Sequence, residues 1–400
     1  MGNLQTTCCG EAETELNTES QIDNGTVSKG AAVGNGYNSR SKNNPKDKNA
    51  LLKNNVDKII RLQSLWRGNM ARNQFKHLKM AAKGTSRYFT SEEANETIET
   101  GKKYDPNQTR KKKKYTYKSG AVFNGEWKGG FRDGYGTQKW VDGATYEGSW
   151  RDNRSHGQGK FTHVDGDVYE GDWANDKANG YGVYTHNNGA TYEGQWKDDL
   201  QNGKGVEKWR DGSEYKGAYR KGKKHGYGVY KWSDGSRFEG QWAENKISGL
   251  GVYSWLDGRQ YKGEWRNNNM EGYGFYIWKD GRQYEGQYRE DKKHGYGIYK
   301  WADGRKYEGY WSYGKQHGLG KYVVPKEGVE KYGLWEDGKR IEWFDDEAVK
   351  DINEGDTSWR DHFKKSDSSN FVEKDADFQK PKGFDMKLIE VKERLSKLDK

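Results

Sequence analysis

Aromatic residues and glycines recur with a single period over more than half of the chain. From Tyr115 on, an aromatic residue opens a unit every 23 residues, a glycine follows two positions later, and a tryptophan or tyrosine follows four positions later. Nine units keep this spacing without interruption, which predicts a repeat architecture. The aromatic positions, with the opening ring first, are Phe123 and Trp127, Tyr146 and Trp150, Tyr169 and Trp173, Tyr192 and Trp196, Tyr215 and Tyr219, Phe238 and Trp242, Tyr261 and Trp265, Tyr284 and Tyr288, and Tyr307 and Trp311.

Alternation inside each unit predicts β-strands. In residues 146–150 a period of two places Tyr, Gly and Trp on one face and Glu and Ser on the other. Gly148, between two rings, is expected to leave space for an aromatic ring from the neighbouring strand. A Gly-x-Gly begins eleven residues after each opening aromatic and is followed by a turn such as Asp142-Gly143, a strong hairpin signal.

One hairpin cannot bury its rings alone, so stacked units must share them. The sequence therefore predicts a mainly β fold: an elongated, single-layer, twisted antiparallel sheet of about nine to ten 23-residue β-hairpin repeats over 115–340, preceded by an α-helix and followed by short helices. A tenth unit contains Gly333 and Trp335, with Lys331 in place of the opening aromatic.

The unit Tyr-x-Gly-x-Trp, Gly-x-Gly, Asp-Gly resembles the MORN repeat. Arrays of this family bind phospholipid, a partner protein or another copy of themselves, and the sequence does not choose among these partners. MORN arrays also precede lipid kinase and histone methyltransferase domains. Only about 60 residues follow the array here, too few for either domain, so we expect no enzyme activity and no cofactor.

A second pattern, over 51–81, predicts an amphipathic basic helix, because apolar residues recur at steps of three and four. This stretch resembles the IQ motif, with Trp66 and Phe75 as apolar anchors and with arginines that would pair with carboxylates. The resemblance implies calmodulin or a calmodulin-like protein as partner; the alternative is a helix that packs on the rest of the protein. The candidate calmodulin-binding residues are Leu62, Gln63, Trp66, Arg67, Gly68, Arg72 and Phe75.

Residues 1–50 are polar and are expected to form a disordered tether. The opening Met-Gly-Asn-Leu-Gln-Thr fits the myristoylation pattern, with Gly2 as acceptor. Cys8 and Cys9, the two cysteines of the chain, stand where palmitates would make a myristoyl anchor stable. The alternative is an unmodified N-terminus. No secretory signal is recognised, which predicts an intracellular protein.

Composition and charge limit the fold class and the kinds of partner that the sequence predicts. Hydrophobic residues make up 31% of the chain and charged residues 32%, yet aromatic residues reach 14%, which favours thin β structure over disorder. The net charge of +10 equals that of residues 51–114, with 16 Lys and Arg against 6 Asp and Glu. Such confinement argues against nucleic acid as partner. Within the expected polar linker 82–114, five cations could bind anionic lipid headgroups or be a solvated run: Arg110, Lys111, Lys112, Lys113 and Lys114.

Residues 341–400 are expected to form a helical cap or tail. Residues 341–352 predict a short acidic helix that could cover the last strand edge. Residues 384–398 predict an amphipathic helix with Leu388, Val391, Leu395 and Leu398 on one stripe, for capping or for partner docking.

These features predict a non-enzymatic scaffold or tether at the cytoplasmic face of a membrane. The alternative is a structural component of a ciliary axoneme or the cytoskeleton, and a targeting subunit of a lipid kinase is less favoured. Histidines His156, His225, His294 and His317 occupy one repeat position, so no metal site is predicted.

Overall fold

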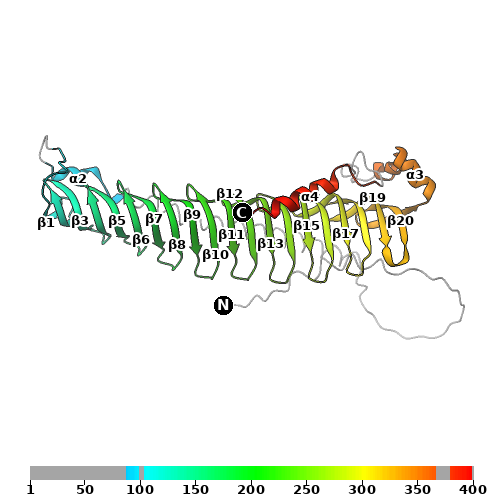
Figure 1. Cartoon of the computed structure of the whole chain (residues 1–400), viewed down its shortest axis with the longest axis horizontal. Coiled ribbons are helices and arrows are strands. Elements are labelled where there is room, and N and C mark those ends of the chain that lie inside the picture. The colour runs from blue at the N-terminus through cyan, green and yellow to red at the C-terminus, as the bar shows by residue number, and fades with distance from the viewer. Residues whose placement is uncertain (1–86, 99–102, 366–378, 399–400) are drawn as a thin grey trace, which may run out of the picture. The chain divides into compact units, whose positions relative to one another are not determined.

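The computed structural model describes residues 87–98, 103–365 and 379–398, and all structural statements refer to these. Their strands form one antiparallel sheet, in which each strand pairs with its neighbours in the chain (Figure 1). The strands are β1 (Lys111–Thr116), β2 (Val122–Lys128), β3 (Phe131–Lys139), β4 (Thr145–Arg151), β5 (Arg154–Thr162), β6 (Val168–Ala174), β7 (Lys177–Thr185), β8 (Thr191–Lys197), β9 (Leu200–Lys208), β10 (Glu214–Arg220), β11 (Lys223–Lys231), β12 (Arg237–Ala243), β13 (Lys246–Ser254), β14 (Gln260–Arg266), β15 (Asn269–Ile277), β16 (Gln283–Arg289), β17 (Lys292–Lys300), β18 (Lys306–Ser312), β19 (Lys315–Val324), β20 (Val329–Glu336) and β21 (Lys339–Phe344). The predicted mainly β, antiparallel repeat sheet is confirmed.

Two kinds of turn alternate along the sheet. Within a unit, strands such as β4 and β5 are joined by two residues, Asp152 and Asn153, with φ of 49° and 65°. This left-handed pair suits the twist of a tight hairpin. Between units the chain makes the longer Asp-Gly loop, where Gly143 has a φ of 99° and the Asp142 Oδ1 accepts from the Ala144 N–H at 3.1 Å. Sequence analysis found the second turn and missed the first, whose signal is an Asp, Asn or Gly-containing pair six and seven residues after each opening aromatic.

The glycines make room for a ring of their own unit, which corrects the expectation for Gly148. Gly148 and Gly159 face each other across β4 and β5. A Cβ on Gly159 would lie 2.3 Å from the hydroxyl oxygen of Tyr146, and a Cβ on Gly148 would lie 2.4 Å from the Cα of Gly159. The Tyr146 ring therefore folds over both glycines, and the space is not taken by a ring of the neighbouring strand.

The opening aromatics and their partners four residues later form the core of one face, called here the aromatic face. The Tyr146 ring meets Trp150 edge to face at 5.0 Å and Trp173 of the next unit at 5.2 Å. The indole N–H of Trp150 donates to the carbonyl of Gly136 in the preceding unit, at 3.1 Å. Each ring thus belongs to two units, so the units stabilise one another only through neighbours.

The described residues 87–98 and 103–114 differ from the polar linker expected over 82–114. Helix α2 (Ser91–Glu96) begins after Thr90, whose hydroxyl accepts from the Glu93 N–H. Strand β1 pairs with β2 along one side, with Tyr115 opposite Phe123. The lysines from 111 to 114 are exposed on this first edge strand. Lysines on a sheet edge discourage pairing with another chain, so the run has a structural role that its composition alone does not reveal.

The C-terminal residues also differ in part from expectation. Residues 341–344 belong to β21 rather than to a helix, because Trp343 continues the ring packing by meeting Trp335 at 5.6 Å. Helix α3 (Asp346–Glu354) begins only after Asp345, whose side chain accepts from the Ala348 N–H. Two short 3-10 turns, η2 (Pro325–Glu327) and η3 (Ser358–Lys365), complete this region.

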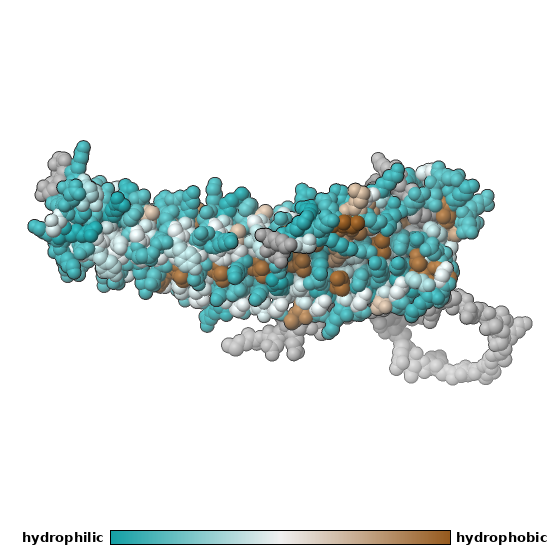
Figure 2. Space-filling model, in the orientation of Figure 1, coloured by the Kyte–Doolittle hydropathy of each residue, from teal (hydrophilic) through white to brown (hydrophobic). Residues whose placement is uncertain are grey.

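Helix α4 (Phe384–Leu395) lies on the opposite face, over β13, β14 and β15 (Figure 1). Its predicted stripe is confirmed: Leu388 and Val391 are buried, and Leu395 and Leu398 pack against the same cluster. Figure 2 shows brown apolar residues beside this helix and further brown residues spaced along the array. The helix therefore covers a sheet face and does not cap a sheet edge.

Candidate binding surfaces

The lipidation and calmodulin-binding residues from sequence analysis lie outside the described residues. This applies to Gly2, Cys8 and Cys9, and to the helix predicted over 51–81 with its motif at 62–75. Their roles stay predictions.

The predicted repeat aromatics, in contrast, are all described, and they form the core rather than a free surface. Each of the eighteen is at most 7% exposed. Burial raises the pKa of tyrosines such as Tyr215 and Tyr261 well above 10, because the phenolate would lose its hydration. These rings hold the array together, so partner binding must use other side chains.

A second row of rings, which sequence analysis did not single out, runs beside the loops that join the units. A tryptophan stands two residues before most Asp-Gly turns, and from Trp209 on a tyrosine of the next long strand packs against it. Centroid distances along the row lie between 4.3 and 5.8 Å from Trp209 to Tyr322. The signal was present as Trp-x-Asp-Gly at 23-residue spacing. The row is Trp209, Tyr230, Trp232, Tyr253, Trp255, Tyr276, Trp278, Tyr299, Trp301 and Tyr322.

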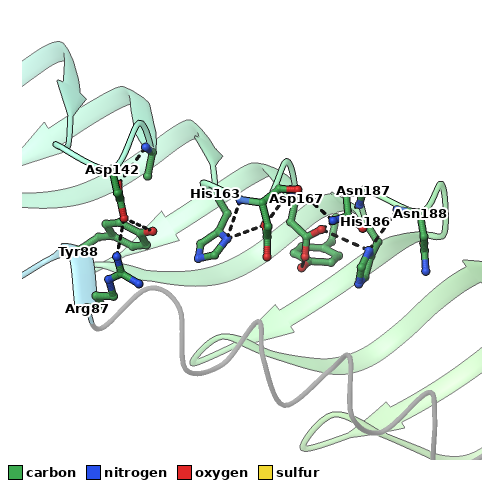
Figure 3. A network of polar contacts seen from close by, with 11 residues as sticks. Arg87, Tyr88, Asp142, His163, Asp167, His186, Asn187 and Asn188 are labelled. Atoms are coloured by element: carbon green, nitrogen blue, oxygen red, sulfur yellow. Dashed lines mark hydrogen bonds and ion pairs between the residues drawn. The ribbon is translucent and has the colours of Figure 1, made fainter.

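Residues Arg87, Tyr88 and Phe89 occupy the aromatic face of the first units. Figure 3 shows Arg87 and Tyr88 pointing at Asp142: the Arg87 guanidinium donates to its Oδ2 at 2.6 Å and the Tyr88 hydroxyl donates at 2.9 Å. The Tyr88 ring packs on Trp140 at 5.0 Å. Burial and the Asp142 bond raise the pKa of Tyr88 to about 12. This segment was expected to be part of a linker. It instead contacts the array, through a bond between Arg87 and Asp142, which are 55 positions apart in the chain.

Phe89 inserts among rings of the second and third units. It lies 5.6 Å from Tyr146 and 5.7 Å from Trp173, centroid to centroid. The strand positions opposite Trp150 and Trp173 carry Ser155 and Ala178, where other units carry larger side chains such as Lys224 or Ile247. Small side chains at these positions leave space for the added ring.

The loops next to this segment contain further polar contacts (Figure 3). The His163 ring pairs with Asp165 at 2.5 Å, and His186 pairs with Asp167 at 3.3 Å. Asp167 also accepts from the Asn187 N–H at 2.8 Å. Over the described parts of the chain, no group of three or more His, Cys, Asp or Glu residues could hold a metal ion.

One of the five cations at 110–114 is already paired. The Arg110 Nε donates to Asp133 at 2.8 Å, and the Tyr104 hydroxyl donates to the same carboxylate at 2.6 Å. Burial alone would raise the pKa of Asp133, but the bonds from Tyr104 and Arg110 hold it below its usual range. The four lysines that follow it are exposed on β1.

Replacing Asp133 by asparagine is expected to lower the free energy of unfolding at pH 7 by about 2 kcal/mol, because a buried, doubly bonded carboxylate is lost. The pKa of Asp133 is lower in the folded state, so its stabilisation is present above the unfolded pKa of about 3.9 and is lost as pH falls through the folded value. Urea unfolding at pH 7 and pH 3 measures this. An equal difference between the two proteins at both pH values would contradict it.

No described helix is both long and apolar enough to cross a bilayer. A comparison with curated proteins gives no match. Among solved structures, the TCP domain of SAS-4 (dCPAP) with a proline-rich motif of Ana2 (dSTIL) from Drosophila melanogaster is 12% identical, with a TM-score of 0.25, and covers 46% of this chain and 95% of that one. The G-box domain of the microcephaly protein CPAP is also 12% identical, with a TM-score of 0.25, and covers 56% and 100%. TM-scores this low do not establish a shared fold.

Family models give a clear result. The IQ calmodulin-binding motif matches residues 56–76. The MORN repeat matches nine times, at 123–145, 146–168, 169–191, 192–214, 215–237, 238–258, 261–281, 284–304 and 307–326. Both families are non-catalytic binding modules. Because the nine matched units coincide with the hairpins of the sheet, the chain belongs to the MORN-repeat proteins and carries an IQ calmodulin-binding motif ahead of its array.

Proposed function

We propose that this protein is a non-enzymatic scaffold that binds calmodulin through its IQ motif, is held at a membrane by an acylated N-terminus, and uses its MORN array to bind a protein partner. The observation that carries the proposal is the succession of an IQ motif at 56–76 and nine MORN units over 123–326 in one chain.

The described part of the array supports a scaffold role. Its core is filled by its own rings, each shared with a neighbouring unit, so the sheet needs no partner to bury its apolar residues. Segments from both ends of the described chain also lie on it: residues 87–89 on the aromatic face and α4 on the opposite face. A surface that binds extended and helical segments of its own chain is suited to bind segments of other proteins.

Calmodulin binding is tested with the full-length protein. We expect binding by isothermal titration in the presence of a calcium chelator, altered when calcium is added. The combined Gln63→Ala, Trp66→Ala and Arg67→Ala variant should lose affinity at least tenfold, which is about 1.4 kcal/mol. The control is Tyr135→Ala, which removes a ring that lies outside the motif and is 56% exposed. Wild-type affinity in the triple variant, or no binding in either calcium state, would contradict this part of the proposal.

A further inference from the structure

Three loops between units hold an arginine in the same way. In the loop after β13, Asp257 accepts from the Arg259 N–H through Oδ1 at 3.0 Å and from the Arg259 Nε through Oδ2 at 2.7 Å. The guanidinium lies over Trp255, with 5.4 Å from its carbon to the ring centroid, and donates to the Tyr276 hydroxyl at 3.4 Å. We call this set of a tryptophan, a turn aspartate and a stacked tyrosine a guanidinium slot.

The next two units repeat the slot. Arg282 bonds Asp280 at 2.7 Å and lies over Trp278 at 5.5 Å. Arg305 bonds Asp303 at 2.7 Å and lies over Trp301 at 5.6 Å. Charge-assisted bonding to a carboxylate and stacking on an indole are the two interactions for which a guanidinium is well suited.

The turn aspartate of such a loop can also bond an arginine that the loop itself does not supply. In the first unit, the position of Arg259 is occupied by Ala144. The Asp142 Oδ1 accepts from the Ala144 N–H, and its Oδ2 accepts from Arg87 at 2.6 Å. Arg87 reaches this carboxylate from the segment ahead of α2. The same oxygen is therefore used for a guanidinium, whichever part of the chain provides it.

Two neighbouring slots lack an arginine. The loop between β9 and β10 has Trp209, Asp211 and Ser213, and the loop between β11 and β12 repeats this pattern with Trp232, Asp234 and Ser236. Ring stacking is conserved in both: Trp209 lies 5.3 Å from Tyr230 and Trp232 lies 5.0 Å from Tyr253, compared with 5.4 Å from Trp255 to Tyr276.

The turn aspartates of these two slots bond only through Oδ1, which accepts from the Ser213 N–H at 2.9 Å and from the Ser236 N–H at 2.8 Å. Within the described ranges, neither carboxylate forms an ion pair, and both aspartates are exposed. In the first of the two slots the Ser213 hydroxyl is also unpaired: Ser213 is 2% exposed and its oxygen has no hydrogen-bond partner among the described residues. Ser213 takes the place of Arg259 in a loop with the same backbone bond, from the tryptophan N–H to the carbonyl four residues later.

We propose that these two slots bind two arginines of a partner protein, presented on an extended polyproline II segment with the pattern Arg-x-x-Arg. Successive units are two strands apart, about 9.6 Å at about 4.8 Å per strand. Three residues of polyproline II span about 9.3 Å, at 3.1 Å each, so arginines three positions apart match the two slots. An exposed carboxylate beside stacked rings supplies the complementary charge and an apolar surface for such a segment.

The proposal refines the protein partner of the scaffold function and does not depend on calmodulin. The experiment uses the full-length protein and a fluorescently labelled, proline-rich peptide with two arginines three positions apart, measured by fluorescence anisotropy. We expect saturable binding. A peptide with lysine in both places should bind at least tenfold more weakly, because an ammonium cannot stack and chelate as a guanidinium does.

Two sets of variants locate the site. In the Ser213→Arg and Ser236→Arg double variant, each loop places its own arginine in its slot, as Arg259 does in the wild-type protein. This variant should bind the peptide at least tenfold more weakly, with an unchanged circular dichroism spectrum. Asp211→Asn with Asp234→Asn should have the same effect on peptide binding. Asp257→Asn, in a slot that already holds its arginine, is the matched control and should leave binding unchanged.

No peptide binding, equal binding of the lysine peptide, or wild-type binding by both double variants would overturn the proposal. If calmodulin binding is retained in any of these outcomes, the proposed scaffold function stands even though the arginine-binding proposal fails.

Discussion

Replacing Tyr215 by alanine is expected to lower the free energy of unfolding of the array by about 3 to 5 kcal/mol. The Tyr215 ring is 0% exposed and meets Tyr219 and Trp242 edge to face, each at 5.3 Å. A Cβ on Gly228 would lie 2.6 Å from ring carbons of Tyr215, so the ring lies directly on the glycine backbone. Alanine would leave a cavity that the sheet cannot close, because the neighbouring strands are fixed by their own ladders.

The measurement is denaturant unfolding combined with amide hydrogen exchange. Arrays whose units contact only their neighbours need not unfold in one step, so exchange should rise first in the strands around β10. The matched control is Tyr181→Ala, which removes the same atoms from a ring that is 53% exposed on the opposite face. We expect a change below about 0.5 kcal/mol there. Equal losses in the two variants would contradict the assignment of the core to the aromatic face.

Replacing Gly2 by alanine is expected to release the protein from membranes into the soluble fraction. Myristoylation requires this glycine, and one myristoyl chain gives only marginal, reversible binding. Palmitates on Cys8 and Cys9 would make the anchor stable, so a Cys8→Ser and Cys9→Ser variant should keep the myristate and be retained only weakly. The measurement is fractionation of native cells into cytosol, detergent-soluble membrane and detergent-insoluble material.

Each outcome of the fractionation has a distinct meaning. Unchanged membrane partitioning of the Gly2→Ala variant would contradict the acyl anchor and direct attention to the exposed lysines of β1. Recovery of the wild-type protein in the detergent-insoluble fraction would favour the axonemal or cytoskeletal alternative. Cys8→Ala is a useful control, because it leaves the acceptor glycine and one palmitoylation position intact.

Much of the fold could be predicted because its rules are local. The alternation Tyr-Gly-Trp in each short strand decides which side chains share a face, and the left-handed φ of the turn residues decides where each strand ends. Since every strand pairs with its chain neighbours, no long-range choice of topology was needed. The family of the chain follows from the same spacing, and the IQ motif is contained in one short segment of the sequence, residues 56–76.

The placement of the flanking segments could not be predicted, because it depends on contacts between residues far apart in the chain. Phe89 was predicted to be linker, since nothing in its immediate neighbours shows that the array provides space for a ring near Ser155 and Ala178. The run at 110–114 has the composition of a charged linker. In the structure Arg110 bonds Asp133 and the lysines belong to an edge strand.

The sequence by itself determined the repeat period, the ring-bearing face and the antiparallel hairpin sheet, because these follow from neighbouring residues and from turn chemistry. Only the tertiary structure decided that residues 87–89 and α4 lie on opposite faces, that Arg87 bonds Asp142, and that Arg259 bonds Asp257 beside Trp255. The physical reason is that a hydrogen bond or ring contact between residues 50 or more positions apart depends on the shape and charge of both partners. The local sequence pattern describes the surroundings of only one partner.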